Sequence, residues 1–114
     1  MTVAGFRRIA MSLPEAVERA HMEHPDFRVK GKIFATLFTR GGVEFGTVKL
    51  TPEQQRKFVT NQPKAFEPVP GGWGRRGYTQ VRLQKVKSAA LREAMFAAGA
   101  NTAPKKLIEG LERS

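Results

Sequence analysis

Basic residues are concentrated in two stretches of the chain that contain no Asp or Glu. Residues 27–43 hold four Lys or Arg, and residues 68–92 hold six. The whole chain carries a net charge of +10, so it attracts polyanions over a distance that salt controls. We therefore predict that cations in these stretches contact phosphates, namely Arg28, Lys30, Lys32, Arg40, Arg75, Arg76 and Arg82. The second stretch also holds Lys85, Lys87 and Arg92.

The segment from Pro70 to Tyr78 combines residue types that bind nucleic acid. Four Gly surround Trp73, Arg75 and Arg76. Gly allows the backbone to approach a ligand closely, Arg offers planar donors to phosphate, and Trp offers a stacking face. No Gly-Lys-Ser/Thr follows, so this is not a Walker-type phosphate loop. The alternative is a wing whose Trp folds back over the edge of the core, and the two interpretations are compatible.

Strand periodicity predicts that some of these side chains share a face. Arg28 and Lys30 are two residues apart, so a strand would place both on one side of a sheet. Tyr78, Gln80 and Arg82 would likewise share a face, and an aromatic ring, an amide and a guanidinium can contact bases or phosphates. The alternative is that these are ordinary solvated strand faces.

Other kinds of site have little support. His21 and His24 lie three residues apart near carboxylates, but Pro25 interrupts the segment and the chain has no third His to complete a site. It also has no Cys, which excludes a thiol nucleophile and thiolate ligands. No Gly-x-Ser-x-Gly elbow or dinucleotide glycine pattern occurs. We therefore expect no transition metal, no cofactor and no enzymatic activity.

The first half of the chain predicts one helix followed by strands. Apolar spacing indicates a helix over residues 3–12, ended by Leu13-Pro14. Residues 15–21 fit either a helix with a capping box or a strand. Residues 27–29 and 32–39 are predicted strands, and the Gly41-Gly42 turn should pair 32–39 antiparallel with 43–50. On the second strand Ile33, Ala35 and Leu37 should share one face, with Phe34, Thr36 and Phe38 on the other.

The second half predicts helices around one strand. Thr51-Pro52-Glu53-Gln54 is a strong helix start, and that helix should end before Pro63. Residues 63–77 are predicted to form a long loop and 78–83 a strand, with Thr79, Val81 and Leu83 on one face. A helix over 88–98 should end at Gly99, and a last helix should begin near Thr102 and Pro104. The order is thus helix, strands, helix, strand and two helices.

These elements predict an α+β fold, an antiparallel sheet with helices packed on one side. The 114 residues suit a single domain spanning 1–114. The sequence lacks an apolar run long enough to span a membrane and an N-terminal signal peptide, so we expect a cytoplasmic monomer that does not bind membranes.

Five segments carry motifs that recur together in one family: residues 13–15 (Leu-Pro-Glu), 24–35 (His-Pro-Asp-Phe-Arg-Val-Lys-Gly-Lys-Ile-Phe-Ala), 48–55 (Val-Lys-Leu-Thr-Pro-Glu-Gln-Gln), 73–83 (Trp-Gly-Arg-Arg-Gly-Tyr-Thr-Gln-Val-Arg-Leu) and 103–107 (Ala-Pro-Lys-Lys-Leu). In combination they resemble the MmcQ/YjbR family over nearly the whole chain. The resemblance implies a double-wing α+β fold similar to the bacterial frataxin-like proteins, and a DNA-binding role. It also implies a strand rather than a helix over residues 15–21, and we favour the strand there. It transfers no catalytic residues, and this basic chain lacks the acidic ridge of frataxin-like iron binding.

We therefore expect a protein that binds nucleic acid, with DNA the expected form, through a basic sheet face and the Gly/Arg/Trp loop. The alternative is a non-catalytic interaction module whose basic face docks an acidic partner protein. The candidate binding residues are Arg28, Lys30, Lys32, Arg40, Trp73, Arg75, Arg76, Tyr78 and Arg82.

Overall fold

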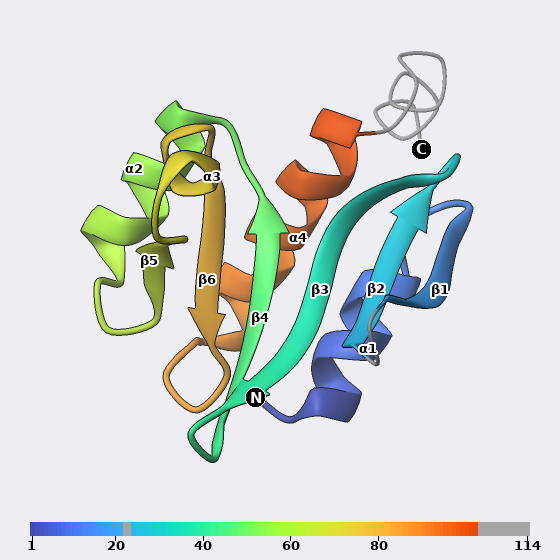
Figure 1. Cartoon of the computed structure of the whole chain (residues 1–114), viewed down its shortest axis with the longest axis horizontal. Coiled ribbons are helices and arrows are strands. Elements are labelled where there is room, and N and C mark those ends of the chain that lie inside the picture. The colour runs from blue at the N-terminus through green and yellow to red at the C-terminus, as the bar shows by residue number, and fades with distance from the viewer. Residues whose placement is uncertain (22–23, 103–114) are drawn as a thin grey trace.

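The computed structural model describes residues 1–21 and 24–102, except for the side chain of His21. Helices and strands follow one another in the predicted α+β pattern, with two further short elements (Figure 1). Their bounds are α1 Val3–Met11, β1 Ala16–His21, β2 His24–Val29, β3 Lys32–Arg40, β4 Val43–Lys49, α2 Pro52–Asn61, β5 Phe66–Pro68, α3 Gly72–Arg75, β6 Tyr78–Arg82 and α4 Ser88–Thr102.

The strands form one antiparallel sheet of six, in the order β1-β2-β3-β4-β6-β5. The predicted pairing of β3 with β4 is confirmed, with Arg40 opposite Val43 across the turn. Gly41 and Gly42 both have positive φ there, which the tight turn requires. The strand interpretation of β1 is also confirmed, since Ala16–His21 pairs along β2.

Helices α1 and α2 begin where the sequence supplies a cap. The hydroxyl of Thr2 accepts a hydrogen bond from the backbone N–H of Gly5 at the start of α1. Thr51 and Gln54 form a reciprocal capping box at the start of α2, and Pro52 occupies the first helical turn. Caps of this kind satisfy N–H groups that have no partner within the helix.

The hydrophobic core lies between the sheet and α1 and α4, as predicted for helices packed on one side. Both helices lie behind the sheet in Figure 1, where the opposite face of the sheet is turned toward the viewer. Thr79, Val81 and Leu83 are fully buried, which confirms the predicted inward face of β6. None of the helices in the described residues is long and apolar enough to cross a membrane.

Two boundary predictions in the second half are wrong. Residues 63–77 are not a continuous loop, because β5 pairs with β6 and α3 forms one short turn of helix. The helix predicted to stop at Gly99 continues to Thr102. Gly99 serves close packing instead, since a Cβ there would lie 2.5 Å from Cδ1 of Leu13. The predicted last helix lies outside the described residues.

The predicted alternation along β3 is also wrong at one point. The register between β2 and β3 shifts at Phe27–Arg28, opposite Ile33 and Ala35, and leaves Phe34 as an extra residue. A bulge of this kind interrupts the two-residue period. Phe34 consequently joins the core with Ala35 and Leu37, while Ile33 lines hollows on the other face of the sheet.

Candidate nucleic-acid interface

The face of the sheet opposite α1 and α4 collects charged and aromatic side chains from all six strands. Strand register defines it, because directly paired residues project from the same side. Across β1 to β6 the register aligns Arg19 with Asp26, Asp26 with Thr36, Thr36 with Thr47, and Thr47 with Gln80. We call this surface the open face. Its residues are Arg19, His24, Asp26, Arg28, Ile33, Thr36, Phe38, Arg40, Phe45, Thr47, Lys49, Tyr78, Gln80, Arg82 and Glu67.

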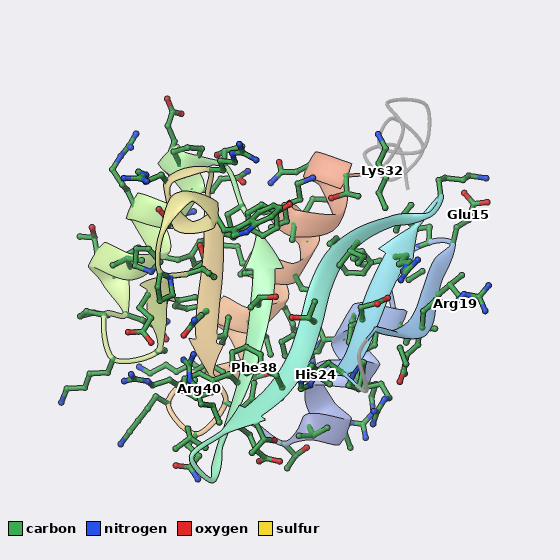
Figure 2. The ribbon with its side chains drawn as sticks, viewed as in Figure 1. Glu15, Arg19, His24, Lys32, Phe38 and Arg40 are labelled. Atoms are coloured by element: carbon green, nitrogen blue, oxygen red, sulfur yellow. The ribbon has the colours of Figure 1, made fainter. Side chains whose placement is uncertain are left out.

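Two aromatic rings and two guanidinium groups stack at one end of the open face. Phe38 and Phe45 are paired across β3 and β4, with ring centroids 5.2 Å apart and planes 11° from parallel. The guanidinium of Arg40 lies 5.5 Å and 5.1 Å from the two ring centres, and that of Arg82 lies 5.8 Å from the Phe45 ring. Figure 2 shows Phe38 and Arg40 together near the turn between β3 and β4. Cation–π contacts hold these cations in place over the sheet.

A second aromatic pair lies at the other end. Trp73 on α3 meets Tyr78 on β6 edge to face, with ring centroids 5.1 Å apart. The Lys49 ammonium lies 5.9 Å from the Tyr78 ring, and the Arg76 guanidinium lies 5.6 Å from the Trp73 ring. Trp73 is 58% exposed and leans on Tyr78, so it does not fold back over the core as the alternative interpretation expected.

Helix α2 anchors this aromatic pair through a buried amide. The Gln55 side chain lies within donating distance of the carbonyl oxygens of Gly74 and Tyr78, at 3.0 Å and 3.1 Å, and of Thr79 Oγ1 at 3.2 Å. These contacts connect α2 to α3 and to the start of β6. The position of Trp73 therefore depends on a residue that belongs to the core side of the sheet.

Two predicted phosphate ligands on the open face are already engaged in ion pairs. Arg28 donates from Nε and Nη2 to both oxygens of the buried Asp26, at 2.8 Å and 3.0 Å. This hydrogen bonding raises the pKa of the Arg28 guanidinium above its ordinary value. Arg82 donates to Glu67 at 3.2 Å in a more exposed pair. Each guanidinium keeps further N–H donors, so an ion pair does not exclude a phosphate contact.

The other predicted cations lie outside the open face. Lys30 sits in the turn after β2 with positive φ and pairs with Glu15, so the prediction that it shares a strand face with Arg28 is wrong. The turn diverts Lys30 from the strand geometry on which that prediction depended. Lys32 is exposed at the start of β3, far from Arg40 in Figure 2. Arg75 is exposed on α3.

Two hollows of about 320 Å³ each lie side by side on the open face and share Ile33 and Thr36. We call the one between β2 and the end of β3 the first hollow, and the one reaching α3 the second hollow. The first is lined by His24, Pro25, Asp26, Ile33, Thr36, Leu37, Phe38, Thr39 and Arg40. The second is lined by Ile33, Phe34, Ala35, Thr36, Thr47, Lys49, Val69, Trp73 and Tyr78.

Several members of this surface were not among the residues predicted from the sequence. Arg19 and Lys49 lie outside the two acid-free stretches, so charge clustering could not find them. Phe38 and Phe45 look like core residues in sequence. Only the pairing of β3 with β4 shows that their rings stack outside the main core.

The possible metal site at His21 and His24 lies partly outside the described residues. Within the described part of the chain, no three His, Cys, Asp or Glu side chains converge as metal ligands. Of the nearby groups, His24 is exposed and Asp26 is paired with Arg28.

Comparison with known proteins identifies the fold and the family. No curated protein matches the chain. The solved structure of protein DR2400 from Deinococcus radiodurans, described as a DUF419 domain, is similar with a TM-score of 0.75 and 20% identity, covering 97% of this chain and 88% of that one. A Pseudomonas syringae protein from a structural genomics consortium has a TM-score of 0.72 and 15% identity, covering 90% of this chain and 99% of that one. At these identities the likeness shows the fold. The model of the YjbR family matches residues 11–98, more than half of the 114 residues, and the chain therefore belongs to the YjbR family.

Proposed function

We propose that this protein binds nucleic acid, with DNA the expected form, through the open face and the adjoining Arg75 and Arg76. The supporting observation is that one sheet face gathers five cations and three aromatic rings, with the ring of Trp73 at its edge. The cations are Arg19, Arg28, Arg40, Lys49 and Arg82, and the rings on the sheet are Phe38, Phe45 and Tyr78.

The charge on the open face is strongly biased toward one sign. Of the acidic residues in the described part of the chain, only Asp26 and Glu67 belong to the open face, so five cations meet two acids. The exposed Glu53 and Glu93 lie on α2 and α4. A surface with this bias attracts a phosphate backbone, and binding releases condensed counterions.

The chemistry of the side chains also fits nucleic acid. Guanidinium groups held over Phe38 and Phe45 keep N–H donors for phosphate oxygens, and stacking limits the rotamer entropy that they lose on binding. Aromatic rings beside such cations provide stacking surfaces for bases. We further propose that the protein acts as a monomer in the cytoplasm.

The test compares two double variants that remove equal charge from opposite sides of the protein. Arg40→Gln with Lys49→Gln changes the open face, while Arg8→Gln with Arg92→Gln changes α1 and α4. Affinities for duplex DNA, single-stranded DNA and RNA are measured at several salt concentrations. We expect the log–log salt slope of the first variant to become shallower by about 1.8 on duplex and about 1.4 on single strands.

The control variant should keep the wild-type slope if binding depends on the open face rather than on net charge. Equal changes in both variants would contradict the proposed face. Binding to an acidic protein through the same face is the alternative. In that case nucleic-acid binding would be weak, and the two variants would not differ.

A further inference from the structure

We propose that the preferred ligand is single-stranded nucleic acid, whose unpaired bases enter the first and second hollows. This inference rests on the proposed function and names the form of nucleic acid that the same surface selects. It depends on the shape and lining of the two hollows, which net charge alone does not determine.

The first hollow offers one aromatic face and polar groups at its rim. The Phe38 ring packs against Phe45 on the β4 side, which leaves its other face toward β2, where this hollow lies. His24 and Arg40 stand at the rim, where both are exposed and carry ring or guanidinium nitrogens that can form hydrogen bonds, whereas Asp26 is buried and paired with Arg28. An inserted base would stack on Phe38 and meet hydrogen-bonding groups at its edge.

The second hollow is bounded by the perpendicular rings of Trp73 and Tyr78. Its other lining residues include Ile33 and Thr47, and the Lys49 ammonium lies over the Tyr78 ring. A nucleic-acid base is flat, stacks on aromatic rings and is attached to an anionic backbone. It therefore matches this combination of an aromatic wall and an adjacent cation. The Trp73 ring is exposed before any ligand arrives, so stacking requires no opening of the core.

The two hollows adjoin along β3, with Arg40 at one end and Lys49 at the other. Successive bases of one strand can therefore occupy them while the backbone passes the cations. A duplex keeps its bases paired and stacked inside, so it offers mainly phosphates to this surface. The apolar lining thus contributes to binding only when bases are unpaired, which is the physical origin of the proposed preference.

Trp73 makes the test direct, because it is the only Trp in the chain. Its fluorescence is followed while the protein is titrated with a thymidine oligonucleotide, with the same strand in a duplex, and with an abasic strand of equal length. We expect the thymidine strand to quench the fluorescence and to bind more tightly than the other two. Loss of one stacked base should weaken binding about 5- to 150-fold.

Two variants test the hollows separately, with a matched control on the other side of the protein. Phe38→Leu and Tyr78→Leu should each weaken binding to the thymidine strand at least about 5-fold, with the salt slope and duplex affinity unchanged. Phe96→Leu on α4, where the ring is 47% exposed, should have no effect. Circular dichroism of each variant checks folding.

The outcomes separate this inference from the function on which it rests. If the thymidine strand, its duplex and the abasic strand bind equally, with a salt slope that Arg40→Gln with Lys49→Gln reduces, the proposed function holds and the single-strand inference is wrong. If none of the three binds in a salt-dependent way, both are wrong. The abasic comparison uses the unaltered protein, so a variant that fails to fold does not prevent a decision.

Discussion

Removing either partner of the Asp26–Arg28 ion pair should destabilise the fold by clearly different amounts. The Asp26 side chain is 1% exposed, whereas that of Arg28 is 31% exposed. Arg28→Met leaves a buried carboxylate without its cation, which costs about 3–5 kcal/mol of unfolding free energy. Asp26→Asn leaves a guanidinium that water can still reach, and the amide oxygen can accept one of its hydrogen bonds, so we expect about 1–2 kcal/mol.

The measurement is urea unfolding at neutral pH, followed both by the fluorescence of the single Trp and by circular dichroism. Coincident curves with equal m-values would justify a two-state treatment of each variant. Arg82→Met is the matched control, because its partner Glu67 is 41% exposed. Exposed pairs contribute about 0–1 kcal/mol, so this variant should stay close to wild type.

A double variant carrying Arg28→Met and Asp26→Asn completes the comparison. It should be more stable than Arg28→Met alone, because the buried charge is gone. Equal costs for Asp26→Asn and Arg28→Met would contradict this expectation. So would a double variant that is no more stable than the worse single variant. This asymmetry is also why Arg40 and Lys49, rather than Arg28, are the informative positions for testing nucleic-acid binding.

Three further predictions test packing, the anchoring of α3 and the basic loop. Gly46→Ala should lower the unfolding free energy by about 1–3 kcal/mol in the same urea assay, because its new Cβ would overlap the buried Phe6 ring. Gln55→Ala should cost about 1–3 kcal/mol and lower the fluorescence anisotropy of the Trp, because α3 loses its amide anchor; unchanged anisotropy would contradict the proposed anchoring. Arg75→Ala with Arg76→Ala should weaken binding to all DNA sequences similarly and make the duplex salt slope shallower by about two; a wild-type slope would remove these two residues from the interface.

The sequence was sufficient to predict those parts of the fold that depend on local signals. Gly41-Gly42 specified the β3–β4 turn because few other residues accept positive φ at two consecutive positions. The Thr51–Gln54 capping box placed the start of α2. The alternation along β6 separated the buried Thr79 and Val81 from the outward Tyr78 and Arg82, since one face of that strand must meet the core.

Features set by tertiary contacts were not predictable in the same way. Gly99 has the same local signal as a helix terminator, and only the approach of Leu13 explains why the helix continues through it. The two-residue period in the sequence places Phe34 on the same face as Thr36 and Phe38. Only the register shift between β2 and β3 at Phe27 turns its side chain into the core. The three residues of β5 are too few to produce a periodic signal and need β6 as their template.

The proposed interface depends on pairings between strands that are far apart in sequence. Lys49 lies opposite Tyr78, and Phe45 lies opposite Arg82, because β4 pairs with β6. In the sequence, α2, β5 and α3 lie between these two strands. A shift of one residue in that register would send every outward side chain of β6 into the core. The buried Thr79 and Val81 prevent such a shift, because it would turn the outward Arg82 guanidinium into the core. The packing that stabilises the inner face therefore also aligns the cations and rings on the open face.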